Sequence, residues 1–352
     1  MMKVTLTNEI LSYITEIEHN RYKVSSVKLS KPVMNRLRKN SKKKSSYASN
    51  KIEGNPLSEK QVDEVIERDE RKHYLKPEQE VRNYFLALNY LEEKVSKKEK
   101  FSQKLILDVQ KLVEKGASKE KIGLRGSMPP GVLFAVYDSK TGNLDYIPPE
   151  YCDIPELLDE LVEYVNTTDD HPLIVAAVVH YQLVTIHPFE DGNGRTARLL
   201  SGYIMDLNGY GFNGIGSLEE YFAYDIDEYY ESIQMGLPAL YYSGRENPPH
   251  PEIWINYFLR MVKLYSGKVC DLQLASEEED IAGSLSFLKG KEKELLQFLI
   301  RNYRGEFTLI EVSRELSVTN KTIINRLAVL VKYGFVLPIL VNQRIRSYEL
   351  SE

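Results

Sequence analysis

The pattern of apolar and polar positions is clearest between Pro172 and Ile186, where apolar residues form an almost continuous run. This run is long enough for a buried helix. The interruptions by Tyr181, Gln182 and Thr185 make it too short and too polar to span a membrane. A proline lies two residues beyond its end and predicts that the helix stops there, since proline cannot donate to the helical hydrogen-bond ladder. After Gly194, helical spacing resumes and predicts a second helix.

A different pattern precedes these helices. Residues 131–137 predict a strand, 138–143 a turn-rich connection, and 144–147 a returning strand. The three segments together predict a β-hairpin in an otherwise helical chain.

The last part of the chain has its own pattern. A helix face near Leu295 is followed by a short helix over 310–316, a turn over 317–319 and a second helix over 320–333, which Gly334 ends. Two strands follow, over 335–337 and 346–350. This order resembles a winged helix-turn-helix, in which the second helix enters the DNA major groove. The residues that we expect to face DNA within 319–346 are Thr319, Asn320, Lys321, Thr322, Asn325, Arg326, Arg344 and Arg346.

Charge only partly supports DNA binding. Residues 289–352 contain eleven Lys/Arg against seven Asp/Glu, a net charge of +4, whereas the whole chain carries −5. The excess is modest, and winged helices also serve as dimerisation or protein-docking modules. Both interpretations therefore remain open.

The length of 352 residues suits two or three domains. We expect an N-terminal helical segment over 1–100, a core over 101–272, a linker over 273–288 and a winged-helix-like domain over 289–352. Cys152 and Cys270 lie far apart with no metal-binding spacing, as is usual in a reducing cytoplasm. The N-terminus has no signal-peptide pattern. We therefore expect a cytoplasmic protein with no membrane partner.

The run from His187 to Arg198 concentrates the chemistry: His-Pro-Phe-Glu-Asp-Gly-Asn-Gly-Arg-Thr-Ala-Arg. Gly192 and Gly194 allow close approach to a ligand, and a glycine turn that leads into a helix presents unpaired N–H groups to anions. Arg195 and the last arginine are three residues apart and can share one helical face toward phosphate oxygens.

Two further residues of this run suit phosphate chemistry. Asp191 is a hard oxygen ligand for Mg²⁺ shared with phosphates. His187 titrates near neutrality and can take a proton from an attacking hydroxyl. The combination predicts a nucleotide-phosphate site.

The run resembles the Fic-family signature, His-Pro-Phe-x-[Asp/Glu]-Gly-Asn-Gly-Arg-x-x-Arg, and every fixed position is present. The resemblance implies a mainly helical fold, a Fic helical core with a small β-hairpin flap. It also implies transfer of AMP from ATP to a hydroxyl side chain (Ser, Thr or Tyr) of a target protein and of the enzyme itself, releasing pyrophosphate. In the roles that it implies, His187 is the base and Asp191 holds Mg²⁺. The phosphate-binding residues that it implies are Gly192, Asn193, Gly194, Arg195 and Arg198.

A second family motif lies upstream, between Ser49 and Gly54. Ser49 and Glu53 are four residues apart and share a helical face, and Gly54 suits the position after a helix end. Beside the signature, this segment is similar to the family's inhibitory motif, [Ser/Thr]-x-x-x-Glu-[Gly/Asn]. The resemblance implies that Glu53 pairs with Arg198 and keeps ATP in a non-productive pose.

The resemblance also assigns the hairpin and one tyrosine. The hairpin corresponds to the family's flap, whose strand aligns the target segment by edge pairing. On the flap we expect target docking by Val132, Leu133 and Phe134. Tyr230 falls where family members often place an adenine-stacking tyrosine, but Leu237 replaces the asparagine expected afterwards.

Together these features predict an autoinhibited protein adenylyltransferase that uses ATP and Mg²⁺ and forms a homodimer. Removal of AMP and transfer of another phosphate-containing group are the enzymatic alternatives. A DNA-binding transcriptional regulator that uses the Fic pocket to sense nucleotide is the alternative from another class.

Overall fold

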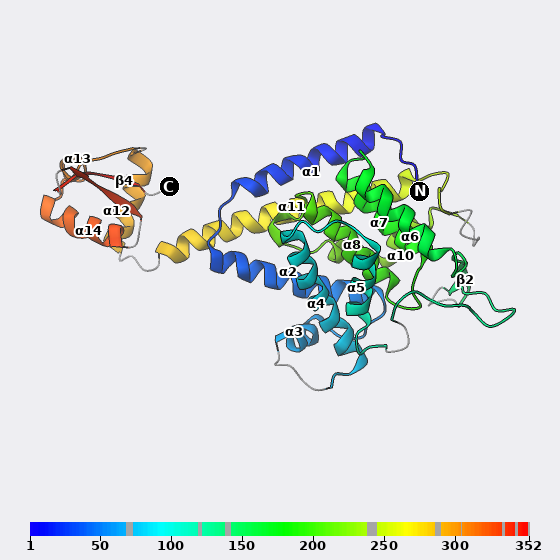
Figure 1. The fold of residues 1–352 in the computed structure, drawn as a ribbon. Helices are drawn as coiled ribbons and strands as arrows, with labels where there is room; N and C mark the ends of the chain where they lie inside the picture. The colour runs from blue at the N-terminus through cyan, green and yellow to red at the C-terminus, as the bar shows by residue number, and fades with distance from the viewer. Residues whose placement is uncertain are drawn as a thin grey trace. The chain divides into compact units, whose positions relative to one another are not determined.

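The computed structural model of this chain describes residues 1–67, 73–118, 122–137, 142–237, 245–285, 290–303, 305–332, 335–341 and 344–350. They form two compact units, Met1–Leu274 and Ala275–Glu352, and each is described by itself. Both units consist mostly of helices (Figure 1), which confirms that the chain is mainly helical; the winged helix-turn-helix assignment stays a prediction. Among the described helices, none combines the length and apolar character needed to cross a membrane.

Helices account for nearly all the regular structure of unit 1. In chain order they are α1 (Asn8–Ser26), α2 (Lys31–Ile52), α3 (Glu59–Glu67), α4 (Lys76–Ser96), α5 (Gln103–Glu114), α6 (Ile154–Thr167), α7 (Pro172–Ile186), α8 (Asn193–Leu207), α9 (Glu219–Tyr224), α10 (Ile226–Gln234) and the first part of α11 (Glu252–Leu285). A short 3-10 turn, Phe212–Gly214, lies between α8 and α9.

Helices α7 and α8 pack against each other at the centre of unit 1. Nearly every residue of α7 is buried, as its continuous apolar sequence requires. Helix α7 has the predicted bounds. It is also tied to α11, because Trp254 Nε1 donates a hydrogen bond to Ala177 O at 2.8 Å. Helices α2, α4 and α5 pack on α8. Helix α2, which ends within the Ser49–Gly54 segment, thus contacts α8, which carries the last residues of the signature.

The predicted hairpin is present but shorter than expected. Strand β1 (Val136–Tyr137) pairs antiparallel with β2 (Leu144–Tyr146). Residues 131–135, which we expected to continue the first strand, are not in a strand. In the observed register the chain beyond β2 would face them with Pro148 and Pro149, which lack the N–H groups that strand pairing needs. Residues 138–141 of the predicted turn lie outside the described part of the chain.

Unit 2 follows the predicted order of elements. It contains α12 (Gly290–Asn302), α13 (Leu309–Glu315), α14 (Asn320–Lys332) and the antiparallel pair β3 (Val336–Val341) and β4 (Arg344–Leu350). Strand β3 continues to Val341, beyond the expected end at residue 337, and β4 begins at Arg344, before the expected start at residue 346. Gly334, which we expected to end the second helix, lies outside the described residues. Buried side chains from all three helices and both strands form a separate core, which includes Leu295, Val312, Leu327, Val336 and Tyr348.

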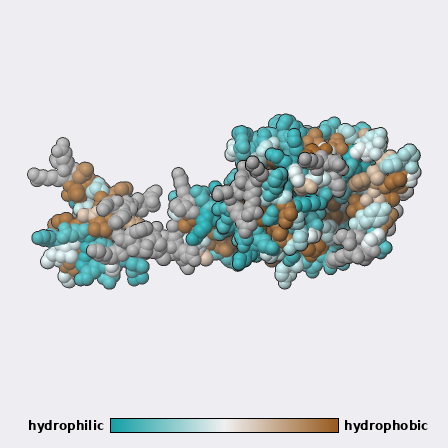
Figure 2. Space-filling view, turned by 90° about the horizontal axis from the view of Figure 1, so that it is seen from below, coloured by the Kyte–Doolittle hydropathy of each residue, from teal (hydrophilic) through white to brown (hydrophobic). Residues whose placement is uncertain are grey.

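The expected linker over 273–288 is not an irregular segment. Helix α11 continues to Leu285, and residues 286–289 lie outside the described chain. The acidic run 277–280 contains three glutamates, which are good helix formers, and so continues the helix rather than ending it. On the face shown in Figure 2, hydrophilic residues predominate over unit 1, with smaller apolar groups between them.

Candidate functional site

His187 lies immediately after the buried helix α7. It is the C-cap residue in a left-handed conformation (φ 49°, ψ 58°), and its backbone N–H donates to Leu183 O at 3.0 Å. Left-handed backbone is uncommon for a residue with a side chain and is often found at functional sites. The turn directs the chain from α7 into the signature loop.

The environment of His187 prepares the imidazole to act as a base. Nδ1 lies 3.2 Å from Val184 O. A carbonyl oxygen only accepts hydrogen bonds, so Nδ1 carries the proton and Nε2 keeps its lone pair. Burial lowers the pKa of His187 to about 4, and the imidazole is therefore neutral at pH 7. The ring of Phe134, from the segment before β1, lies 5.9 Å from the imidazole, centroid to centroid.

Arg125 fixes the backbone beneath this histidine. Its Nε donates to His187 O at 2.9 Å, and its backbone N–H donates to Pro188 O at 2.9 Å. Its guanidinium also donates to Pro149 O and lies 4.6 Å from the centre of the Phe134 ring. Arg125 thus joins the flap segment to the signature loop.

The N-terminus of α8 is the part of the site that could receive an anion. Gly192 is its N-cap with φ 82°, a conformation that favours glycine, and the helix begins at Asn193. The first turn of a helix leaves backbone N–H groups without helical partners and carries the positive end of the dipole. This geometry can hold phosphate oxygens.

Asn193 has a role within the loop. Its Oδ1 accepts from Phe189 N at 3.0 Å, and its Nδ2 donates to Phe189 O at 2.9 Å. Phe189 itself is fully buried. The Asn193 side chain therefore closes the signature loop, and the phosphate contact that the resemblance implies for Asn193 stays a prediction.

Arg198 lies behind the anion-binding end of α8 and is almost completely buried. Its Nε donates to Ser49 Oγ at 2.8 Å, and its Nη2 donates to Glu53 Oε1 at 2.6 Å and to Ser49 O at 3.1 Å. Nη1 donates to the Tyr229 hydroxyl at 3.3 Å. Burial acts to lower the pKa of Arg198, but Tyr229 and Glu53 outweigh burial and raise it, so the guanidinium is always charged.

Glu53 reaches the same end of α8 from the C-terminus of α2. A Cβ built on Gly194 would overlap with Glu53 Oε1, so this carboxylate lies directly against the first turn of α8. Gly54 has φ 81° at the position after the C-cap, as predicted. The structure thus brings together Ser49, Glu53 and Arg198, which the sequence separates by almost 150 residues.

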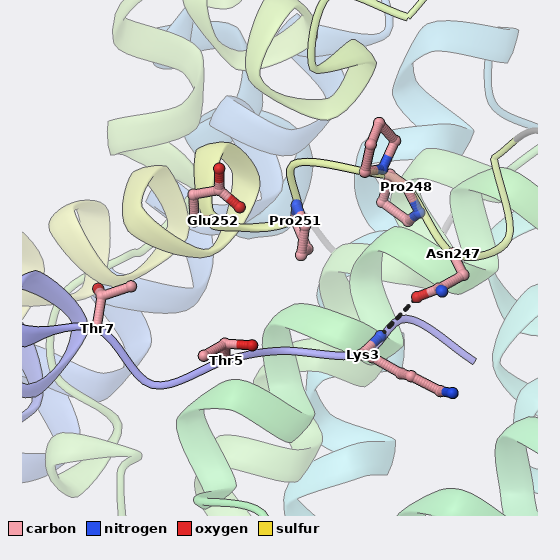
Figure 3. Close-up of a pocket in the computed structure, with 8 residues that line it drawn as sticks. Lys3, Thr5, Thr7, Asn247, Pro248, Pro251 and Glu252 are labelled. Carbon is pink, nitrogen blue, oxygen red and sulfur yellow. Dashed lines mark hydrogen bonds between the residues drawn. The ribbon is translucent and has the colours of Figure 1, made fainter.

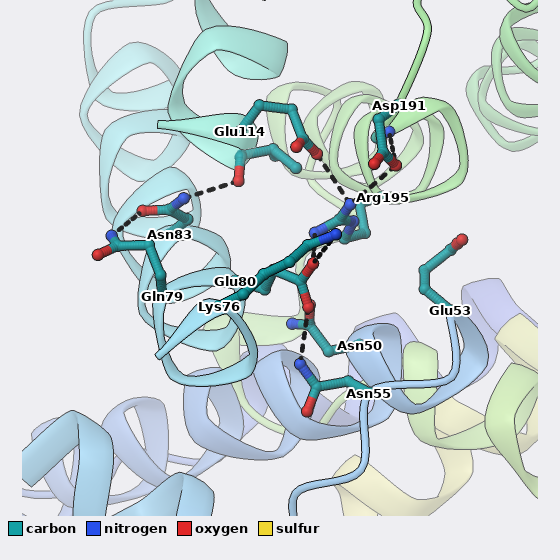
Figure 4. Close-up of polar contacts among 12 residues, drawn as sticks. Asn50, Glu53, Asn55, Lys76, Gln79, Glu80, Asn83, Glu114, Asp191 and Arg195 are labelled. Atoms are coloured by element: carbon teal, nitrogen blue, oxygen red, sulfur yellow. Dashed lines mark hydrogen bonds and ion pairs between the residues drawn. The ribbon is translucent and has the colours of Figure 1, made fainter. Parts of the chain in front are cut away.

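Arg195 is surrounded by carboxylates (Figure 4). Its Nη2 lies 2.8 Å from Glu114 Oε1 and 3.4 Å from Asp191 Oδ1, and its Nη1 lies 3.9 Å from Glu80 Oε1. Burial raises the pKa of Glu114 to about 7. The sequence analysis missed both glutamates. The guanidinium of Arg195 is buried and paired with Glu114, and its predicted contact with phosphate stays a prediction.

Asp191 lies at the edge of this group. Its side chain is 30% exposed, and Oδ1 accepts from Gly192 N at 2.8 Å. Within the described residues, no cluster of three or more His, Cys, Asp or Glu side chains could hold a metal alone. Mg²⁺ is usually held by one or two carboxylates together with substrate phosphates and water, and a single partly exposed aspartate beside the N-terminus of α8 fits that pattern.

Tyr229, rather than its neighbour, contacts the signature. Its buried hydroxyl lies 2.9 Å from Nε2 of His180 and accepts from Arg198. Tyr230 is 40% exposed, and its ring centre lies 5.2 Å from that of Tyr229. Adenine stacking by Tyr230 stays a prediction.

The flap residues differ in exposure. Val132 and Leu133 are about half exposed (49% and 51%), whereas Phe134 is partly buried against Arg125 and His187. Target docking by these three residues also stays a prediction.

A cavity of about 330 Å³ lies away from the signature, between the N-terminal segment and residues 247–252 (Figure 3). Lys3 N donates a hydrogen bond to Asn247 Oδ1 at 2.9 Å and so joins two of the segments that line it. None of the predicted site residues lines it. We therefore assign this cavity no role in the chemistry of the signature.

The fold and site define a mainly helical protein with a neutral histidine beside a helical anion site. Residues 57–205 match the Fic/DOC family profile, and this part of the chain is a Fic domain.

Protein adenylyltransferase fic-1 of Caenorhabditis elegans is 44% identical over 72 residues, which are 20% of this chain and 14% of that protein. Protein adenylyltransferase Fic of Drosophila mojavensis is 28% identical over 206 residues, 56% of this chain and 38% of that protein. The chain thus spans well under half the length of these curated relatives.

Solved structures share the fold. A Fic family protein from Desulfovibrio desulfuricans G20 has a TM-score of 0.63 at 19% identity, covering 100% of this chain and 98% of that one. Fic-1 from Caenorhabditis elegans has a TM-score of 0.58 at 24% identity, covering 77% and 73%. At these identities the likeness shows the fold alone.

Proposed function

We propose that this chain is a protein adenylyltransferase. It transfers AMP from ATP to the hydroxyl of a Ser, Thr or Tyr side chain, on a target protein and on itself, and releases pyrophosphate. The observation that carries the proposal is the neutral imidazole of His187, whose Nε2 lone pair is available at the start of a loop that ends in a helical anion site.

The reaction follows from these groups. The acceptor hydroxyl oxygen attacks the α-phosphorus, and its proton passes to Nε2 of His187. The bond between the α-phosphorus and the bridging oxygen breaks, and pyrophosphate leaves with the electron pair. The N-terminal turn of α8 stabilises the phosphate charge, and Arg198 is placed to hold the distal phosphates once it is free of Glu53.

Asp191 is the residue that would hold Mg²⁺, supported by its exposure and by its position beside Gly192. Bound there, Mg²⁺ would neutralise phosphate charge. Arg195 pairs with Glu114, and its Nη2 also lies 3.4 Å from Asp191 Oδ1, a contact that would orient the aspartate.

We further propose that Glu53 inhibits transfer. Two observations support this role: Glu53 occupies a hydrogen-bonding position on Arg198, and its carboxylate lies where an anion would approach Gly194. A carboxylate and a phosphate compete for the same guanidinium and the same helix end. Release of Glu53 therefore frees both groups for ATP.

The alternatives differ in what His187 does. Removal of AMP needs a water positioned near Glu53, and transfer of another group needs a donor other than ATP. A nucleotide sensor needs no base, so the neutral, hydrogen-bonded His187 favours catalysis.

The test is incubation of purified wild type, Glu53→Gly and Glu53→Gly/His187→Ala with ATP and Mg²⁺, followed by intact mass. We expect an AMP adduct chiefly in Glu53→Gly and none in the double variant. Matched controls are Glu246→Gly, in an exposed loop, and His19→Ala, on the exposed face of α1. ATP binding without an adduct in any variant would contradict AMP transfer and favour another donor or a sensor. Loss of AMP from the modified protein on addition of wild type, with AMP released into solution, would indicate removal of AMP by hydrolysis.

Unit 2 supports a second proposal, a DNA partner. Asn320, Lys321 and Asn325 are exposed along α14, and Arg346 is exposed on β4. Exposed apolar side chains also lie on this unit (Ile324, Leu340 and Ile345), and these favour a protein partner or a second copy of the chain. A gel shift with the chain's own promoter, weakened by Lys321→Ala, would support DNA. A shift in sedimentation of the protein alone, weakened by Leu340→Ser, would support self-association.

A further inference from the structure

The C-terminal end of α2 is fixed by a closed set of backbone hydrogen bonds. Gly54 N donates to Lys51 O and Asn55 N donates to Asn50 O, both at 3.0 Å, which is the Schellman pattern of helix ends. Glu53 is the C-cap residue of this motif. The direction of the Glu53 side chain therefore depends on where the end of α2 is held.

Asn55 joins this helix end to α4. Its Nδ2 donates to Pro77 O at 3.0 Å and to Glu80 Oε2 at 2.9 Å, and its Oδ1 accepts from Leu57 N at 3.1 Å. Both amide hydrogens and the carbonyl oxygen of one side chain are thus used. Figure 4 shows Asn55 below Glu80, with Glu53 on the adjacent end of the helix.

Glu80 faces the signature as well. Its Oε1 lies 3.9 Å from Arg195 Nη1 and 3.7 Å from Lys76 Nζ, and its side chain is only 15% exposed. One carboxylate thus lies between the segment that follows Glu53 and the first arginine of the signature.

Helix α2 needs such contacts because its buried face is largely polar. Its buried residues include Ser41, Lys43, Ser45, Ser46, Ser49 and Asn50, with Ala48 and Ile52 as the apolar members. Hydrogen bonds and ion pairs therefore hold α2: Ser45 Oγ donates to Glu219 Oε2 at 2.7 Å, and Lys43 Nζ lies 2.6 Å from Glu67 Oε1. A helix held in this way by directional contacts is sensitive to the loss of one at its end.

We propose that Asn55 and Glu80 are positioning residues that hold the carboxylate of Glu53 on Arg198 and Gly194. The proposal deepens the inhibitory role proposed above and rests on it. Loss of the Asn55–Glu80 hydrogen bond frees the end of α2, and Glu53 then occupies the anion site for a smaller fraction of time. Neither residue touches the transferred group.

The experiment compares Asn55→Ala with wild type, and Asn55→Ala/Glu53→Gly with Glu53→Gly, by the rate of AMP incorporation. We expect Asn55→Ala alone to raise the rate at least about fivefold, the factor for one net hydrogen bond of about 1 kcal/mol, since the substitution removes all three side-chain hydrogen bonds of Asn55. In the Glu53→Gly background it should change nothing, because no carboxylate remains to be positioned. Asn40→Ala, on the exposed side of α2, is the matched control.

A second pair separates positioning from damage to the fold. Glu80→Gln keeps an acceptor for Asn55 and should stay inhibited, whereas Glu80→Ala should be activated. The ratio of ATP to ADP affinity, measured by calorimetry with His187→Ala also present, should rise in Asn55→Ala, and it should rise in Glu53→Gly for the same reason. A merely structural role would lower both affinities together.

Each failure has its own meaning. Two results would overturn the positioning role and leave the inhibitory role intact. One is an equal change in rate when Asn55→Ala is made in wild type and in Glu53→Gly. The other is that Glu53→Gly is active while neither Asn55→Ala nor Glu80→Ala is activated. No change in rate or in the ATP to ADP ratio on Glu53→Gly overturns the inhibitory role, and the positioning role with it.

Discussion

Glu53 and Arg198 form a hydrogen-bonded ion pair of 2.6 Å between the end of α2 and the first turns of α8. The arginine is almost fully buried, whereas the glutamate side chain is 33% exposed. The exposed partner is the one that can leave, since its charge is readily solvated, while Arg198 keeps its contacts with Ser49 and Tyr229. The pair is therefore suited to exchange a protein carboxylate for a ligand phosphate.

Gly194→Ala tests whether Glu53 and ligand anions use the same space. A Cβ at this position overlaps with Glu53 Oε1 and lies 3.2 Å from Arg198 Nη1. We expect the variant to lose ATP affinity at least tenfold, even when Glu53→Gly is also present, as measured by calorimetry. Gly202→Ala on the same helix, where an added Cβ meets no atom within 4 Å, is the control. Unchanged ATP binding in Gly194→Ala/Glu53→Gly would place the anion elsewhere.

The pH dependence of transfer tests the state of His187. Burial lowers its pKa from 6.5 to about 4, so the neutral form needed for proton transfer persists on acidification. Single-turnover rates of Glu53→Gly at saturating MgATP should be flat from about pH 8 to about pH 5.5. A rate that halves near pH 6.5 would show an ordinary histidine pKa.

The lowered pKa of His187 also makes the stability of the fold depend on pH. Between about pH 4 and 6.5, the unfolded chain binds a proton at His187 that the folded chain does not. The contribution of this group to the free energy of unfolding therefore falls as pH decreases through that window. Urea unfolding of His187→Ala should lose this part of the pH dependence relative to wild type.

Glu114→Ala tests the partner of Arg195. Glu114 is fully buried and Arg195 nearly so, and removing the carboxylate leaves a buried guanidinium with only the longer contacts to Asp191 and Glu80. We expect a loss of about 3–5 kcal/mol in the free energy of unfolding, measured in urea. Glu114→Gln, which keeps the shape and an acceptor oxygen, should cost less. Equal stability of Glu114→Ala and wild type would show that the pair contributes nothing.

The parts that the sequence could predict have strong local signals. Helix α7 was predicted with its observed bounds because its apolar run and the following proline act over a few residues. Gly54 has the expected positive φ for the same reason, since a helix end before a proline leaves few other conformations.

The parts that escaped prediction depend on distant contacts. Glu114 reaches Arg195 across 81 residues, and Glu80 lies on another helix, so no spacing identifies either. The first flap strand was overextended because strand propensity does not show where a pairing partner ends. The two hydrogen bonds between the Asn193 amide and the Phe189 backbone were not predicted either, because the sequence does not show how the loop closes on itself.

Leu327→Ala tests whether the two units are stable independently. Leu327 is fully buried in the core of unit 2, which is separate from that of unit 1. The cavity left by the substitution should cost unit 2 about 2–5 kcal/mol. In calorimetry of the full chain, we expect one transition to move to lower temperature while the other stays in place, with ATP binding by the Fic domain unchanged. Leu337→Ala, at a position 52% exposed on β3, is the control and should move neither transition. A single transition that shifts as a whole, together with weaker ATP binding, would show instead that the units fold as one cooperative body, because damage to either core would then reach the site around His187.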